Sequence, residues 1–280
     1  MHKILIIVFA LIVSAGCLFA QESSVKQYVL DEVVFDIDGL TNENALVRSV
    51  ELEVGSSFDS EEALLAYLDR KRQDMVNKRV FDTVTLEPHR ISDDGNTARY
   101  RATFTVVDSW TFIPIPYPKY NSNTGFRIGL QMFYDNAFGT LTDWFLGMNY
   151  DFGTNEYRIS PTVSGVGLLG LTWSFSAAQS YNVSEKSSGG VPIAEWSYHQ
   201  SSFGFGSGIK LFGPFSYGFG PSFSFRYAYD DILGAGGFTE DYFDFGYRHN
   251  VGLSQIDWIE NYRDGYSAGI SHSISVVNRE

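Results

Sequence analysis

Residues 215–230 read FSYGFGPSFSFRYAYD, and this stretch decides the fold class. Its odd-numbered positions are Phe, Tyr or Pro, whereas its even-numbered positions are Ser, Gly, Arg, Ala or Asp. Such alternation indicates a β-strand with one aromatic and one small or polar face, and it continues beyond the roughly 5–6 residues of an ordinary strand. A long strand with an unbroken aromatic face fits lipid as well as it fits a protein core.

The same alternation recurs throughout residues 109–280. It predicts strands near residues 110–117, 126–134, 142–152, 157–163, 169–177, 196–211, 215–230, 243–253 and 266–276. A change of phase between Tyr198 and Phe203 predicts a bulge in the sixth of these strands. Short links are expected near 135–139, 165–167, 212–213 and 259–263, and long ones near 181–194 and 230–241. Long loops on one side and short turns on the other are typical of an antiparallel outer-membrane β-barrel.

Residues 27–108 predict a separate α+β module. A strand over 28–37 ends at a glycine turn, and helices are expected over 42–50 and from Asp59 to about Lys78. Two further strands, starting near Val80 and Tyr100, flank a hairpin turn at 92–96. The expected order is β-α-α-β-β.

Residues 1–20 have the pattern of a secretory signal peptide: Lys3, an apolar run from Ile4 to Val13, and small residues before Gln21. The apolar run is short for a spanning helix of about 20 residues. Cys17 is the only cysteine, and its lipidation remains an alternative to cleavage after Ala20. Cleavage after Ala20 would leave no thiol for a disulfide or a metal site.

Composition and spacing argue against several function classes. A formal charge of −13 disfavours nucleic-acid binding, which needs a basic face. The serines do not form a nucleophile elbow, and His89, His199, His249 and His272 do not have metal-ligand spacing. The sequence therefore predicts no catalytic, cofactor-binding or metal-binding residue, and a protein that is not an enzyme.

Four residues of the module carry a resemblance to a known domain family. Gly39 in Ile37-Asp38-Gly39-Leu40, Gly55 and Phe58 in the segment 52–58, and Phe81 in the segment 78–84 match the pattern of POTRA domains. The resemblance covers residues 27–108 and implies the POTRA fold in the periplasm.

A second resemblance covers the strand array. The turn Asp135-Asn136-Ala137-Phe138-Gly139 after the second strand, and residues 262–266 (YRDGY), expected in the turn before the ninth, resemble the outer-membrane assembly-factor superfamily. This is the BamA-like, or bacterial surface antigen, family. Its barrel has about sixteen strands. The resemblance therefore implies that residues 109–280 form the N-terminal part of a transmembrane barrel, as one half of it, a truncated product or a fragment.

This resemblance implies a function in assembly, insertion or translocation of proteins at an outer membrane. Extended client segments would pair with two strand edges. The candidate residues are Val80, Phe81, Val84 and Leu86 in the module and Trp110, Phe112, Ile113 and Ile115 in the first barrel strand.

The expected partners are outer-membrane lipid, unfolded outer-membrane or secreted clients, and accessory assembly lipoproteins or a second chain that completes the barrel. Pro114, Pro116 and Pro118 fit a poorly pairing seam but would also limit templating. The alternative function is a small structural or pore-forming outer-membrane surface protein that carries a POTRA module.

Overall fold

The structure, a computed structural model, describes residues 26–122, 125–234 and 241–279. The expected signal peptide, with Cys17, lies outside these residues, as does part of the expected link at 230–241. The described chain contains two α-helices, and neither α2 (Glu43–Val50) nor α3 (Glu61–Val76) is long and apolar enough to cross a bilayer.

A four-stranded sheet accompanies these helices in the order β2-β1-β4-β3. Its strands are β1 (Gln27–Asp38), β2 (Ser57–Phe58), β3 (Phe81–Asp93) and β4 (Thr97–Asp108). The two-residue strand β2 was not predicted, because it is too short to show alternation. It pairs with β1 through Tyr28 and Phe58.

Both helices begin where their capping residues predict. The Asn42 side chain accepts a hydrogen bond from the backbone N–H of Ala45 (3.3 Å), and the Ser60 hydroxyl accepts one from that of Ala63 (3.1 Å). These bonds satisfy donors that have no partner within the helix. Asp94 stabilises the turn between β3 and β4, because its carboxylate accepts hydrogen bonds from the backbone N–H groups of Asn96 and Thr97.

The chain divides into two compact units. The first comprises the described residues up to Val34 with Glu53–Asp69 and Leu86–Thr103, and the second comprises Phe35–Leu52, Arg70–Thr85 and everything described from Phe104 onward. The first unit buries Leu30, Leu64, Leu68, Ala98, Tyr100 and Ala102. The second buries Leu46, Val50, Met75, Phe104 and Val106 around α2 and the end of α3.

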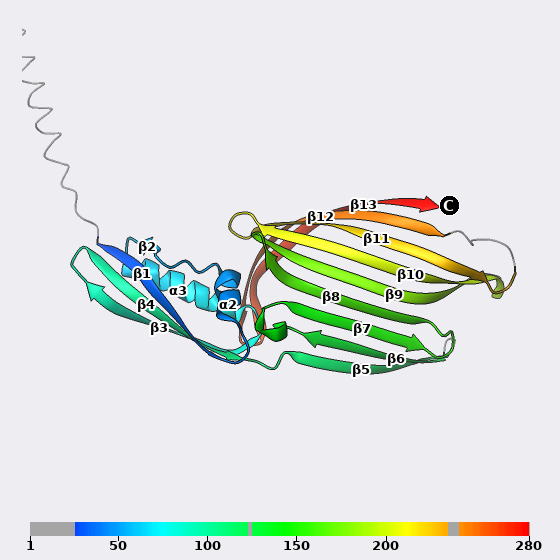
Figure 1. The fold of residues 1–280 in the computed structure, drawn as a ribbon, viewed down its shortest axis with the longest axis horizontal. Helices are drawn as coiled ribbons and strands as arrows, with labels where there is room; N and C mark the ends of the chain where they lie inside the picture. The colour runs from blue at the N-terminus through cyan, green and yellow to red at the C-terminus, as the bar shows by residue number, and fades with distance from the viewer. Residues whose placement is uncertain (1–25, 123–124, 235–240, 280) are drawn as a thin grey trace, which may run out of the picture. The chain divides into compact units, whose positions relative to one another are not determined.

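The second unit contains a nine-stranded antiparallel sheet whose strands lie side by side in chain order (Figure 1). They are β5 (Phe112–Asn121), β6 (Gly125–Tyr134), β7 (Asp143–Asp151), β8 (Tyr157–Leu168), β9 (Leu171–Ser188), β10 (Val191–Lys210), β11 (Phe215–Asp231), β12 (Tyr242–Ile259) and β13 (Tyr262–Arg279). The nine predicted strands are confirmed. The sheet is open, with β5 and β13 as its edges.

Strand registers bring most of the apolar residues of the sheet onto one face, although Ile113, Phe133 and Phe145 lie on the other. Directly paired residues on this face include Phe112 with Tyr134, Trp144 with Val163, Phe175 with Phe205, and Phe245 with Val276. Many are exposed, including Ile128, Trp144, Ile159, Phe175, Phe203, Phe205, Phe225, Val251, Ile270 and Val276. A continuous exposed apolar face of this extent is typical of a surface that contacts lipid or another protein.

From β9 to β13 small residues dominate the opposite face. The hydroxyl oxygens of Ser174 and Ser176 on β9 lie where a Cβ on Gly206 and Gly204 of β10 would stand. The same relation recurs between Ser222 on β11 and Gly246 on β12. A serine on one strand thus packs against a glycine on the next, so the side chains on this face extend only a short way from the backbone.

Three local predictions differ from the structure. Most of residues 181–194, expected as a long link, extend β9 and β10, and the turn between these strands is Gly189-Gly190. Residues 262–266 begin β13 rather than forming a turn, because the turn lies at Glu260-Asn261, where Glu260 adopts a φ of 53°. The irregularity expected in the sixth strand lies between Ser197 and His199, at the N-terminal end of the predicted stretch.

Candidate functional site

Asp108, the last residue of β4, holds the turn that follows β1. Its carboxylate accepts hydrogen bonds from the backbone N–H groups of Leu40 (2.7 Å) and Thr41 (2.9 Å) and from the Thr41 hydroxyl (2.6 Å). Thr41 is only 6% exposed, so its polar atoms have little access to water. Charge-assisted bonds of this kind are about twice as strong as neutral ones.

Asn136 extends this arrangement to the turn between β6 and β7. Its side-chain amide donates to the Thr41 hydroxyl oxygen (2.6 Å) and its side-chain oxygen accepts from the N–H of Leu141 (2.9 Å). Asn136 is 5% exposed and adopts a φ of 52°. The group Leu40, Thr41, Asp108, Asn136 and Gly139 is called the polar junction below.

Two glycines make the polar junction possible. A Cβ on Gly39 would overlap the Asp108 carboxylate, and one on Gly139 would overlap the carbonyl oxygen of Leu40. Both have positive φ, 151° and 73°. The close approach also lets the N–H of Asn42 donate to the carbonyl of Gly139 (2.8 Å). These positions therefore need glycine for space as well as for backbone conformation.

A second contact joins α3 to the β12–β13 hairpin. The backbone N–H of Trp258 donates to the Asn77 side-chain oxygen (2.8 Å), and its carbonyl accepts from the Gln73 amide (2.9 Å). The pairing of β12 with β11 stops at Leu253 and Phe215, so the two side-chain amides serve Trp258 where no β11 residue pairs with it. Gln73, Asn77 and Trp258 are called the amide bracket.

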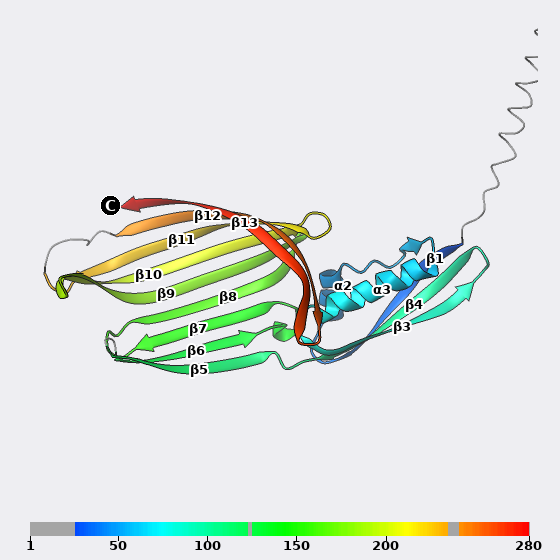
Figure 2. The same ribbon diagram turned by 180° about the vertical axis from the view of Figure 1, so that it is seen from behind.

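Charged groups strengthen the amide bracket. The Arg70 guanidinium lies 2.9 Å from the Asp257 carboxylate, which also accepts from the Asn77 amide (2.9 Å). The guanidinium groups of Arg79 and Arg263 lie 4.3 and 5.1 Å from the Trp258 ring centroid, within the range of cation–π attraction. Figure 2 shows the turn of the β12–β13 hairpin at the same end of the sheet as α2.

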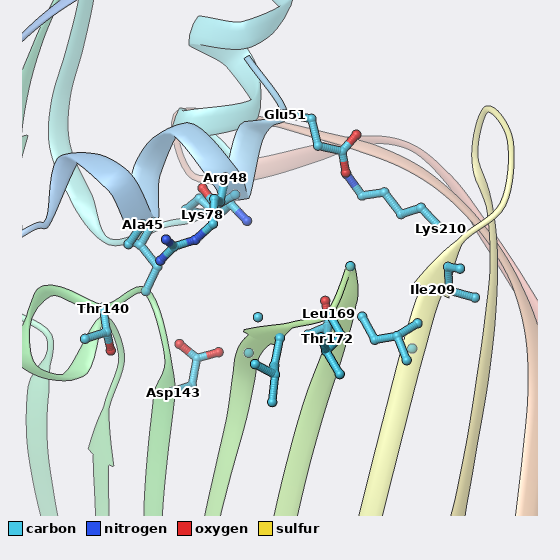
Figure 3. Close-up of a pocket in the computed structure, with 18 of the residues that line it drawn as sticks. Ala45, Arg48, Glu51, Lys78, Thr140, Asp143, Leu169, Thr172, Ile209 and Lys210 are labelled. Carbon is cyan, nitrogen blue, oxygen red and sulfur yellow. The ribbon is translucent and has the colours of Figure 1, made fainter. Parts of the chain in front are cut away.

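A cavity of about 740 Å³ is lined by α2, Lys78, and the ends of β7, β8, β9 and β10. Figure 3 shows Arg48 and Lys78 on one side of it and Asp143, Leu169 and Thr172 on the other. The Lys210 ammonium lies 2.8 Å from the Glu51 carboxylate, and this hydrogen bond lowers the pKa of Glu51. Lys78 is open to the cavity but lies among protein atoms, and this partial desolvation lowers its pKa.

The four residues that carry the POTRA resemblance lie at separate places. Gly39 adjoins Asp108, and the Gly55 N–H donates to the carbonyl of Leu30 (2.8 Å). Phe58, in β2, packs on Tyr67 with ring centroids 5.1 Å apart. Phe81 is half-buried at the start of β3.

The predicted pairing residues of the module differ in accessibility. β3 is an edge strand, and Phe81, Val84 and Leu86 lie half-buried within it. Val80 precedes the strand, is 4% exposed, and gives its carbonyl to the N–H of Ser109 (2.9 Å). Val80 is therefore not free to pair with a client.

The predicted pairing residues near β5, the first strand of the nine-stranded sheet, also differ in accessibility. Trp110 lies before β5, and its side chain is 80% exposed. The N–H of Asp135 donates to the carbonyl of Thr111, so odd-numbered residues of β5 direct their backbone groups at β6. The backbone N–H and C=O groups of Ile113 and Ile115 are consequently bonded to β6, whereas those of Phe112 point away from β6.

The polar junction and the amide bracket were not predicted as sites. Asn136 belongs to the turn motif Asp135–Gly139, and its partner Thr41 lies 95 positions away in the chain. A pairing over that distance leaves no local pattern. The only sequence signal for the polar junction is the presence of glycine at positions 39 and 139, where two segments approach closely. Among the described residues, no group of three or more His, Cys, Asp and Glu side chains could hold a metal ion.

No family model and no curated protein matches the sequence. Solved structures match by fold. The crystal structure of BamA from Haemophilus ducreyi lacking POTRA domains 1-3 has a TM-score of 0.56 and 11% identity, over 89% of this chain and 48% of that chain. The chain shares the fold of BamA. CdiB from Acinetobacter baumannii has a TM-score of 0.53 and 11% identity, over 91% of this chain and 47% of that chain. The chain thus spans about half the length of the structures it matches.

Proposed function

We propose that the chain acts at an outer membrane as a member of the assembly-factor superfamily, helping to insert or translocate other proteins without enzyme chemistry or a cofactor. The similarity in fold to BamA and CdiB over about nine-tenths of this chain carries the proposal. The continuous exposed apolar face supports it, because such a face is suited to lipid.

In this proposal residues 27–108 are a POTRA domain in the periplasm, delivered by a signal peptide at 1–20, and residues 109–280 lie in the membrane. The polar junction supports this assignment of roles, since it ties the turn after β1 to the turn between β6 and β7. Residues 35–52, which include the turn after β1 and share one compact unit with the sheet, could pass a bound client to it. Clients would be unfolded outer-membrane or secreted polypeptides, with accessory lipoproteins or a second chain as further partners.

The test is an assembly reaction in liposomes. An eight-stranded outer-membrane barrel protein, unfolded in urea, is added to liposomes with and without the full chain, and its folding is followed by its shift in semi-native gel electrophoresis. We expect the chain to accelerate folding several-fold. The matched control is Asp108→Ala, which loses the polar junction and should accelerate folding less.

Equal folding rates with and without the chain would refute the proposal. If the chain then also formed a heat-modifiable single-chain species that conducts ions across the liposome, the alternative of a small pore-forming or structural surface protein would replace it.

A further inference from the structure

The cavity between α2 and the ends of β7–β10 contains two cationic side chains that lack an ionic partner. Arg48 on α2 and Lys78, just after α3, line its helix side, across from the ends of β8 and β9 (Figure 3). Within the described residues neither side chain forms an ion pair, whereas Lys210, the third cation of the cavity, is paired with Glu51 (2.8 Å). A guanidinium and an ammonium group on one wall favour a bound anion, because both donate charge-assisted hydrogen bonds.

The surroundings of Lys78 also favour an anion. Partial desolvation, and then the positive charge of Lys210, lower the pKa of the Lys78 ammonium. A negative group in the cavity would oppose both effects and stabilise the charged form of Lys78. The cavity is lined by three cations and by two carboxylates, those of Glu51 and Asp143, so one positive charge is left for a ligand to neutralise.

Glycines lower the wall of the cavity at the β8–β9 turn. Neither Gly167 nor Gly170 has another atom within 4 Å of the place that a Cβ would occupy. Gly167 pairs with Thr172, and Thr172 pairs with Gly208, so the strand ends beside the turn also carry small residues on this face. A group that crosses the turn at Gly170 can therefore reach the two cations.

The same turn carries leucines on the apolar side of the sheet. Leu168 and Leu171 pair directly, and Leu171 continues the alternation of Trp173 and Phe175 on the apolar face. Leu168 and Leu169 are 58% and 86% exposed. Exposed leucines next to an opening that leads to cations suit a ligand with an apolar chain and an anionic head.

We propose that this cavity binds the phosphodiester head of an anionic phospholipid, with Arg48 and Lys78 at the phosphate and the acyl chains against Leu168 and Leu171. The inference rests on the proposed membrane location of the sheet and identifies a lipid that the sheet holds. In that location the strand ends lie at the level of the lipid headgroups. The cavity, at about 740 Å³, has the volume of an ordinary small-molecule site.

Other phosphate carriers fit the cavity less well. A free phosphate ion or a soluble phosphate ester would leave the exposed leucines in water. A phosphomonoester carries up to two negative charges, more than the single positive charge that remains in the cavity. A phospholipid with a choline head has the same acyl chains, but its head has no net charge to offset that of the cavity.

Native mass spectrometry of the full chain in detergent micelles tests the site. Phosphatidylglycerol and phosphatidylcholine with identical acyl chains are added in equal amounts, and the fraction of the chain that retains one lipid is measured. We expect a roughly fivefold preference for phosphatidylglycerol, the size of effect that a partly exposed charge pair gives. Arg48→Gln and Lys78→Gln should each reduce this preference, and the double variant should abolish it. Lys186→Gln, which removes a cation from the opposite end of β9, is the matched control and should change nothing.

Asp143→Asn tests the charge argument in the opposite direction. The substitution keeps the shape of the side chain and removes a negative charge that faces the two cations across the cavity. We expect the chain to retain roughly threefold more phosphatidylglycerol, with little change for phosphatidylcholine. A decrease in retained phosphatidylglycerol would contradict binding of the phosphate in this cavity. This variant gains a ligand, so its expected result cannot be produced by misfolding.

Glycerophosphoglycerol, the same head without acyl chains, separates a lipid from a soluble phosphate ester. In excess it should leave the bound phosphatidylglycerol in place. Displacement of the lipid by this head alone would overturn the lipid assignment, and so would equal retention of the two phospholipids or an undiminished preference in the double variant. If the chain accelerates client folding but retains both phospholipids equally, only this inference fails. If it selects phosphatidylglycerol but does not accelerate folding, the lipid site stands and the proposed function fails.

Discussion

Replacing Asp108 with alanine should open the polar junction. The substitution leaves three donors without their acceptor: the N–H groups of Leu40 and Thr41 and the Thr41 hydroxyl. Leu40 is 74% exposed, so its N–H can turn to water at little cost. Thr41 is only 6% exposed, and each buried polar group that loses its partner costs about 1–3 kcal/mol. Loss of both Thr41 hydrogen bonds should therefore lower the free energy of opening this segment by about 3 kcal/mol or somewhat more.

This loss of stability can be measured by hydrogen exchange of the Leu40–Thr41 segment, followed by mass spectrometry on the protein in detergent. Since about 1.4 kcal/mol corresponds to a factor of ten, exchange should become roughly 100-fold faster. Asp108→Asn keeps the shape and one acceptor oxygen but loses the charge, so its effect should be smaller, roughly tenfold. Asp82→Ala, which removes an exposed carboxylate from β3, is the control and should change nothing.

A double-mutant cycle tests whether the polar junction acts as one unit. Asn136→Ala removes the donor to the Thr41 hydroxyl oxygen, so its effect should be less than additive with that of Asp108→Ala. Exchange within about threefold of wild type in Asp108→Ala, or an equal change in Asp82→Ala, would refute the assignment of a structural role to Asp108.

Three further outcomes are expected. Gly139→Ala should destabilise the second unit by well over 1 kcal/mol, as judged by the urea midpoint, and by more than Gly170→Ala, since both glycines have a φ of 73° but Gly170 has open space around it. Asn77→Ala should speed exchange of the Trp258 amide about tenfold, because its N–H loses the acceptor while the β12–β13 pairing remains. The hydrogen bond from Tyr100 lowers the pKa of Glu61 below its ordinary value of 4.5, so its contribution to stability is present above pH 4.5 and is lost as the pH falls. A urea midpoint that falls less steeply in Glu61→Gln than in wild type on acidification would check this, and parallel pH profiles would contradict it.

Alternation predicted the nine strands because a strand directs successive side chains to opposite faces, and most strands of this sheet carry their apolar residues on one of them. It failed for residues 181–194, where Ser184 and Lys186 pair with Trp196 and Ala194 although they have no apolar alternation. A strand with polar residues on both faces needs only a neighbouring strand with which to form backbone hydrogen bonds. Composition therefore suggested a loop where the backbone continues in the sheet.

The contacts that hold the sheet to the helices could not be predicted for a different reason. Asn77 and Trp258 lie 181 positions apart, and the bond exists only because β12 extends past the end of β11. Neither residue is unusual in its own segment. Glycine was the one feature of the sequence that could indicate such contacts. Gly39 and Gly139 have positive φ, and each lies against another segment with no space for a Cβ.

The polar junction and the amide bracket are joined through the helices. Thr41 precedes α2, whose last carbonyl, that of Val50, accepts a hydrogen bond from the Lys71 ammonium on α3 (2.7 Å). α3 then leads to Asn77 and the β12–β13 hairpin. A continuous path of hydrogen bonds and helix thus runs from the β6–β7 turn to the β12–β13 hairpin.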